Sequence, residues 1–138
     1  MWLEYLRYEV WTRARILNLH LFGHVSFNKN EHEFITKELK EHLKTINAHI
    51  KGKSFMVGSH LTIVDIWCAI VLQEQMQATL DTNFRNSMAP LVTYFKSICA
   101  LPEFKARLGN VKPGKKTMAP KFEGEQKKEE NKDKAAKK

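Results

Sequence analysis

Apolar residues recur every three or four positions along the start of the chain, which is the spacing of one face of an α-helix. Neither Gly nor Pro interrupts this segment, and Gly23 follows it, as is usual just past a helix because Gly accepts positive φ. The pattern predicts a helix from Trp2 to about Leu21. Its inward face is expected to carry Leu3, Leu6, Val10, Ala14, Leu17 and Leu21.

A second amphipathic pattern predicts a helix from about Lys29 to Ile50, after a loop over 23–30 and before a stop at Gly52. Its apolar side carries Phe34, Ile35, Leu39, Leu43, Ile46 and Ile50. The short apolar segment 55–58 predicts a loop tucked against the core.

Pro90 and Pro102 each suit the first turn of a later helix, and Gly109 is a stop for the last one. The helix after Pro90 is expected to point Leu91, Tyr94, Phe95 and Ile98 inward. No segment shows a period of two, so the predicted fold class is all-α, a helical bundle.

Between these elements, residues 63–72 are apolar almost all round, with Asp65 the only charge. This pattern predicts a central helix covered on all sides, whose end emerges into solvent at 73–75. Thr62 and Asp65 match the capping-box pattern in its variant with Asp, and Leu61 and Ile66 are spaced for the hydrophobic staple. Helix capping therefore explains both polar residues without a catalytic role.

The composition, 43% hydrophobic and 28% charged, is typical of one soluble globular domain, which we place at residues 1–111. Residues 112–138 are expected to be a disordered lysine-rich tail or linker, because they have too few large apolar residues to form a core. The net charge of +8 divides into +3 over 1–111 (13 Lys/Arg against 10 Asp/Glu) and +5 over 112–138 (10 against 5). A basic docking face for nucleic acid on the body is thus weakly supported, and any RNA affinity is expected to be weak and to lie in the tail.

Candidate chemistry is sparse. Cys68 and Cys99 have no CxxC spacing and no secretory signal, which predicts reduced core thiols in a cytoplasmic protein without a membrane span. His20 and His24 are four apart, but Gly23 intervenes and no further ligand type lies nearby, so no metal and no cofactor is expected. His42 and His49 are expected to be solvated.

The first predicted helix carries an aromatic cluster formed by Trp2, Tyr5, Tyr8 and Trp11. Core or interdomain packing explains such rings, but rings that lose their cover form an apolar patch of the kind that binds partners. The cluster is therefore the candidate partner surface, for self-association or for a docked partner chain.

The run from Phe55 to Ile66, with Val-Gly, a short spacer and Leu-Thr-x-x-Asp-Ile, resembles the signature of the glutathione S-transferase C-terminal domain family. Three further segments resemble the elongation factor 1-gamma branch of that family, and with the change to a lysine-rich linker they extend the likeness over about residues 1–122. They are the 23–30 loop, Phe84-Arg85, and the stretch from Phe95 to Val111.

The resemblance implies a non-catalytic scaffold that anchors the nucleotide-exchange subunits of the elongation factor 1 complex in the cytoplasm. Family members carry a thioredoxin-like domain in front of these helices, which supplies the glutathione site, whereas this chain starts directly in the helical half. We therefore expect a fragment or a shortened paralogue, with no catalytic residue. Two alternatives remain open: the C-terminal half of a glutathione transferase enzyme, and a transferase-like assembly domain of the aminoacyl-tRNA synthetase system.

Overall fold

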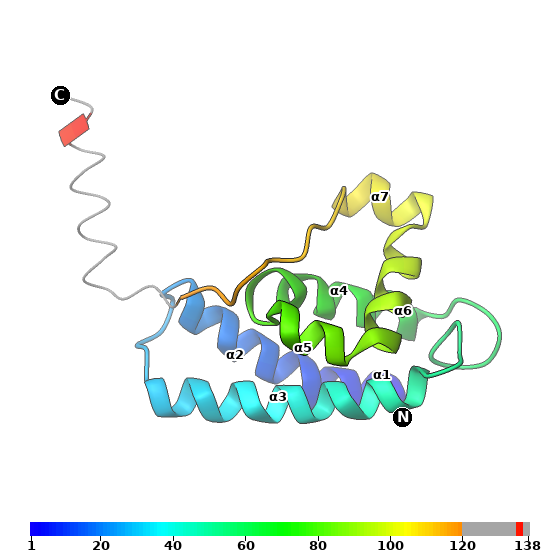
Figure 1. Ribbon diagram of the computed structural model, residues 1–138, viewed down its shortest axis with the longest axis horizontal. Helices are drawn as coiled ribbons and strands as arrows, with labels where there is room; N and C mark the ends of the chain where they lie inside the picture. The colour runs from blue at the N-terminus through cyan, green and yellow to red at the C-terminus, as the bar shows by residue number, and fades with distance from the viewer. Residues whose placement is uncertain (120–134, 137–138) are drawn as a thin grey trace.

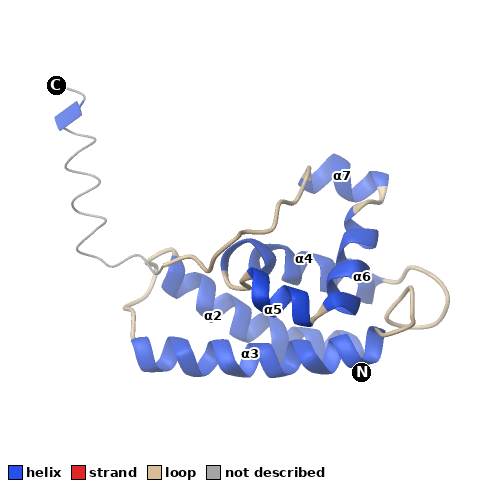
Figure 2. Ribbon diagram, viewed as in Figure 1, coloured by secondary structure: helices blue, strands red, loops and turns tan. Residues whose placement is uncertain are grey.

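The computed structural model describes residues 1–119 and 135–136 of the chain. Throughout these residues every regular element is helical and no strand occurs (Figure 2). The predicted all-α fold class is confirmed. The elements are α1 (Trp2–Tyr5), η1 (Leu6–Trp11), α2 (Thr12–Leu21), α3 (Lys29–Ile50), α4 (Ile63–Ala78), α5 (Thr82–Ser87), α6 (Ala89–Cys99) and α7 (Pro102–Leu108).

The first predicted helix forms over its full length, but its middle is the π-helical segment η1. The predicted inward residues from Leu6 to Leu21 are buried, whereas Leu3 is exposed. The wider i→i+5 bonding of a π segment shifts the phase of the turns before it, so a pattern that assumes 3.6 residues per turn misplaces Leu3.

The long helix α3 has the predicted bounds, and the Asn28 side chain caps it by accepting a hydrogen bond from the Glu31 amide at 3.2 Å. It runs along α2, and its apolar face packs against the first helical segments and α6 (Figure 1). Phe34 does not belong to that face, because its side chain is 61% exposed while the neighbouring Ile35 is buried.

The prediction that the end of α4 emerges into solvent at 73–75 holds for the exposed Glu74 but is wrong for Gln75 and for the end of the helix. The helix continues to Ala78, with Gln75 and Met76 fully buried. Gln75 stays inside because its Nε2 donates to Oδ1 of Asn18 on α2 at 3.1 Å, which satisfies part of the amide in the core.

After α7 the chain runs back across the C-terminal end of α4 (Figure 1). The Gly114 amide donates to the Met76 carbonyl at 3.1 Å, and the Met118 amide donates to the Ala78 carbonyl at 2.7 Å. The hydroxyl of Thr82 donates to the Lys115 carbonyl at 2.9 Å. The predicted disordered tail begins at residue 112, but 114–118 are docked on the body by these bonds; of the remainder, 120–134 and 137–138 lie outside the described residues.

Candidate interaction surface

The N-terminus of α4 is held by the carboxylate of Asp65, which is fully buried. This side chain accepts from the Thr62 amide at 3.0 Å, from the Met56 amide at 2.8 Å and from the hydroxyl of Tyr94 at 2.5 Å. The first bond is the Asp arm of a capping box. The second fastens the 55–58 loop and the third fastens α6, so one carboxylate joins three segments.

Cys68 lies one turn after Asp65 and is also fully buried. Burial, with a smaller contribution from the Asp65 carboxylate, raises the pKa of its thiol to about 12. Burial is also the main cause that raises the pKa of Tyr94. A protonated thiol without access to solvent is a poor nucleophile, so this cluster is suited to hold the core together rather than to react.

The other side of α4 is exposed, which corrects the prediction of a helix covered on all sides. Ile63, Ile66 and Ile70 are 65%, 37% and 44% exposed. Their spacing of three and four residues places them on one helical face. We call these three residues the α4 stripe. Leu61, which precedes the helix, is exposed as well, so both residues of the proposed staple lie at the surface.

The aromatic residues predicted as one partner surface separate into three environments. Trp11 packs against Trp67 of α4, with ring centroids 6.2 Å apart. Trp67 follows Ile66 of the α4 stripe in the sequence. Tyr8 is 61% exposed, and the guanidinium of Arg7 lies 5.5 Å from the centroid of its ring. Trp11 is thus partly buried against α4 and Tyr8 is exposed, whereas Trp2 and Tyr5 face α3.

The contacts of Trp2 and Tyr5 also correct the expectation that His42 and His49 are solvated. The ring of Trp2 stacks on His49 with centroids 4.1 Å apart, and the Tyr5 hydroxyl lies 2.8 Å from Nδ1 of His42. His49 is further fixed by its Nε2, 2.7 Å from the Met56 carbonyl. These two histidines join the first helix to α3 and are part of the packing.

His20 is buried and pairs with His32 rather than with His24, with their Nδ1 atoms 3.4 Å apart. Burial, and to a lesser degree the charge of His20, lowers the pKa of His32. In the described part of the chain no group of three or more His, Cys, Asp or Glu side chains is placed to hold a metal ion. Likewise, none of the described helices combines the length and hydropathy needed to cross a bilayer.

Comparison with known proteins supports the resemblance seen in the sequence. The family model described as "Glutathione S-transferase, C-terminal domain" matches residues 19–109. Elongation factor 1-gamma-B of Xenopus laevis is 32% identical over 90 residues, which are 65% of this chain and 21% of that protein. Elongation factor 1-gamma of Carassius auratus is 29% identical over 111 residues, which are 80% of this chain and 25% of that protein.

Among solved structures, the crystal structure of the GST-like domain of elongation factor 1-gamma from Saccharomyces cerevisiae superposes with a TM-score of 0.80 at 15% sequence identity. The match covers 87% of this chain and 55% of that one, and at this identity it establishes the fold. The chain spans about a fifth to a quarter of the length of the curated relatives that it matches.

Proposed function

Since the chain belongs to the glutathione S-transferase C-terminal domain family, we propose that it is a non-catalytic protein-interaction domain that acts in the cytoplasm as part of the translation elongation factor 1 complex. Its partners in this proposal are the nucleotide-exchange subunits, which it anchors through protein contacts. The curated relatives support the association with translation elongation, because those named above are elongation factor 1-gamma proteins.

The observation that carries the proposal is the α4 stripe. Isolated exposed apolar residues are normal on a protein surface, but a row of them on one face of a helix, beside a tryptophan pair, is typical of a surface that is covered in an assembly. Trp11 and Tyr8 extend this surface onto the first helical segments in the proposal, since aromatic side chains contribute most of the binding free energy at many interfaces.

The proposal of a non-catalytic role is supported by what the reactive side chains do. Asp65 accepts hydrogen bonds from two backbone amides and from the hydroxyls of Thr62 and Tyr94, and the Cys68 thiol is buried beside Asp65 and Tyr94. Asp65 and Cys68 are fully buried and Tyr94 is 3% exposed, so a substrate in solvent has little access to these groups.

The proposal is tested by capture with purified partners. The tagged chain is mixed separately with nucleotide-exchange subunits and with an aminoacyl-tRNA synthetase, and it is also assayed for retention on glutathione-agarose and for conjugation of glutathione to an electrophilic model substrate. We expect stoichiometric capture of an exchange subunit and neither retention nor conjugation. Capture of the synthetase alone would favour the assembly-domain alternative, and glutathione conjugation would favour the enzyme alternative.

A further inference from the structure

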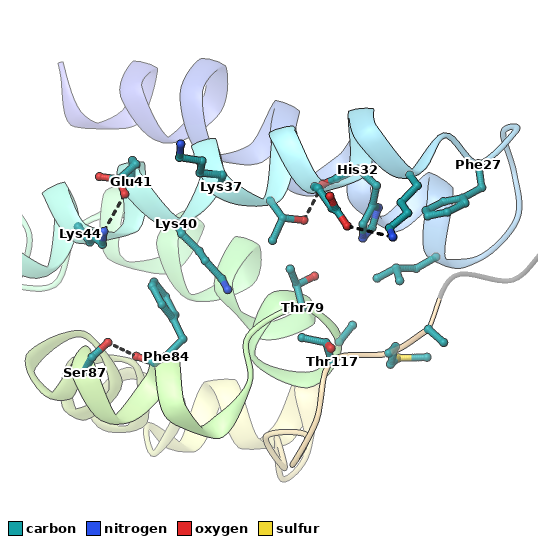
Figure 3. A pocket seen from close by; sticks show the side chains of 17 residues that line it. Phe27, His32, Lys37, Lys40, Glu41, Lys44, Thr79, Phe84, Ser87 and Thr117 are labelled. Carbon is teal, nitrogen blue, oxygen red and sulfur yellow. Dashed lines mark hydrogen bonds and ion pairs between the residues drawn. The ribbon is translucent and has the colours of Figure 1, made fainter.

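A groove of about 790 Å³ lies on a part of the molecule that the proposed function does not use, between α3, α5, the end of α4 and the docked segment 117–119 (Figure 3). Its floor is apolar. It is formed by Leu21, Phe27, Ala78, Phe84 and Met118. None of the α4 stripe residues lines it, so it is a separate surface.

The wall contributed by α3 carries more positive than negative charge. Four lysines and two glutamates line the groove: Lys29, Lys37, Lys40, Lys44, Glu33 and Glu41. Lys29 pairs with Glu33 at 3.8 Å, and Lys44 pairs with Glu41 at 2.7 Å. These pairs leave an excess of two positive charges on this wall.

Within residues 1–119, no carboxylate forms an ion pair with Lys40 or Lys37. Lys40 extends from α3 toward Phe84 on α5, with its Nζ 5.2 Å from the ring centroid (Figure 3). This places one ammonium group over an aromatic ring in the space between the two walls. A ligand that carries an anionic group beside an apolar one matches both features.

We propose that this groove binds a peptide segment of a partner protein in which bulky apolar side chains alternate with Asp or Glu. The apolar side chains lie on the floor formed by Phe84 and Met118, and the carboxylates pair with Lys40 and Lys37. The lining lysines extend from Lys29 to Lys44, which corresponds to about 22 Å of helix at 1.5 Å per residue, enough to accompany a short segment rather than a whole domain.

A nucleic-acid strand fits the groove less well. Among the described residues, only Lys37 and Lys40 on this wall lack an ion pair, which is too few to follow the successive phosphates of a strand, and the body carries only a small excess of positive charge, +3 over residues 1–111. The docked segment 117–119 also narrows the groove with Thr117 and Met118, which do not present charges to a backbone of phosphates.

The experiment measures binding of defined probes to the full chain by fluorescence polarisation, with the site located by amide chemical shifts in ¹⁵N-labelled protein. The probes are a short fluorescein-labelled peptide of alternating leucine and glutamate pairs, the same peptide with lysine for glutamate, the same with serine for leucine, and a single-stranded oligouridine. We expect only the leucine–glutamate peptide to bind and to shift the amide signals of α3 and of residues 115–119. Its affinity should fall as the salt concentration is raised.

The double variant Lys37→Glu with Lys40→Glu should lower the affinity for the acidic peptide by about tenfold or more, because it reverses two charges at the site. The matched control is Lys51→Glu with Lys105→Glu, which makes the same change in charge at two exposed lysines that do not line the groove, and it should bind like the native chain. Circular dichroism melts establish that both double variants fold.

Other outcomes overturn the proposal. Tighter binding of oligouridine than of the acidic peptide would make the groove a nucleic-acid site, and equal effects of the two double variants would show only nonspecific charge attraction. Shifts of groove amides on dilution without any peptide would indicate a second copy of the chain as the occupant. If the Phe122→Ser substitution shifted the same amides in the full chain, the occupant of the groove would be the chain's own C-terminal segment.

Discussion

Replacing Asp65 by Ala is expected to be among the most destabilising single changes in the described part of the chain. The carboxylate is fully buried and accepts from the Met56 amide, the Thr62 amide and the Tyr94 hydroxyl at 2.8, 3.0 and 2.5 Å. Alanine leaves these donors without an acceptor, at a cost of about 1–3 kcal/mol for each buried group. Since such costs do not add fully, we expect a loss of about 3–5 kcal/mol in the free energy of unfolding.

Urea unfolding followed by circular dichroism measures this loss directly. Tyr94→Phe removes one donor and should cost about 1–3 kcal/mol. The double variant Asp65→Ala with Tyr94→Phe should cost less than the sum of the two single changes by about 1 kcal/mol, because the hydroxyl no longer lacks an acceptor. Tyr8→Phe is the matched control, since that hydroxyl is on an exposed ring, and it should stay within about 0.5 kcal/mol of the native chain.

The reasoning would be refuted if Asp65→Ala destabilised the chain no more than Tyr8→Phe does. A second contradiction would be strict additivity of Asp65→Ala and Tyr94→Phe, because it would show that the two side chains do not interact in solution.

Three further predictions follow from the described contacts. The Cys68 thiol, with its pKa raised to about 12 by burial, should react with Ellman's reagent only after denaturation, whereas the partly exposed Cys99 reacts in the native chain; equal native rates would contradict this. Because burial and the charge of His20 lower the pKa of His32 below its usual 6.5, the unfolded chain binds the proton more readily. Stability should therefore be fully present above pH 6.5 and fall as the pH drops toward the folded-state pKa, and urea melts of His32→Gln should show a smaller fall than the native chain. Gly114→Ala would place a Cβ 2.2 Å from the Gln77 carbonyl oxygen, so segment 112–119 should detach and trypsin should cleave at Lys115 and Lys116 faster; an unchanged digestion pattern would show that the segment is not held there.

The apolar periodicity was sufficient to predict most of the fold. It placed α3 with its actual bounds because an uninterrupted amphipathic pattern lies between a loop and Gly52. It missed α5, because that helix has only six residues and begins directly after Asp81, whose carboxylate caps it by accepting from the Phe84 amide at 2.8 Å. A short sequence rich in Asp, Thr and Asn favours a turn as much as a capped helix.

The candidate site was harder to predict. A continuous apolar sequence in α4 cannot show which face is covered, because coverage depends on tertiary neighbours that lie far away in sequence. The stripe formed by Ile63, Ile66 and Ile70 is therefore visible only in the fold. The aromatic cluster stays a predicted partner surface, but the sequence could not show that Trp2 and Tyr5 contact histidines of α3 while Tyr8 stays exposed.

The docking of segment 114–118 on the body could not be predicted from the sequence either. Its composition is that of a linker, and it is held by backbone hydrogen bonds to the end of α4 and by a hydrogen bond from the Thr82 hydroxyl of α5. Composition indicates whether a segment can form a core of its own, and it does not indicate whether the segment docks on one that is already formed.

The central claim, that the α4 stripe binds a protein partner, is tested most directly by isothermal titration calorimetry with a purified nucleotide-exchange subunit. The variant is Ile63→Asp, and the matched control is Phe34→Asp, which places the same charge on an equally exposed apolar residue of α3. We expect Ile63→Asp to weaken binding by about tenfold or more, since it buries a charge in an apolar contact, and Phe34→Asp to bind like the native chain. Equal affinities of the native chain and of both variants would contradict the account.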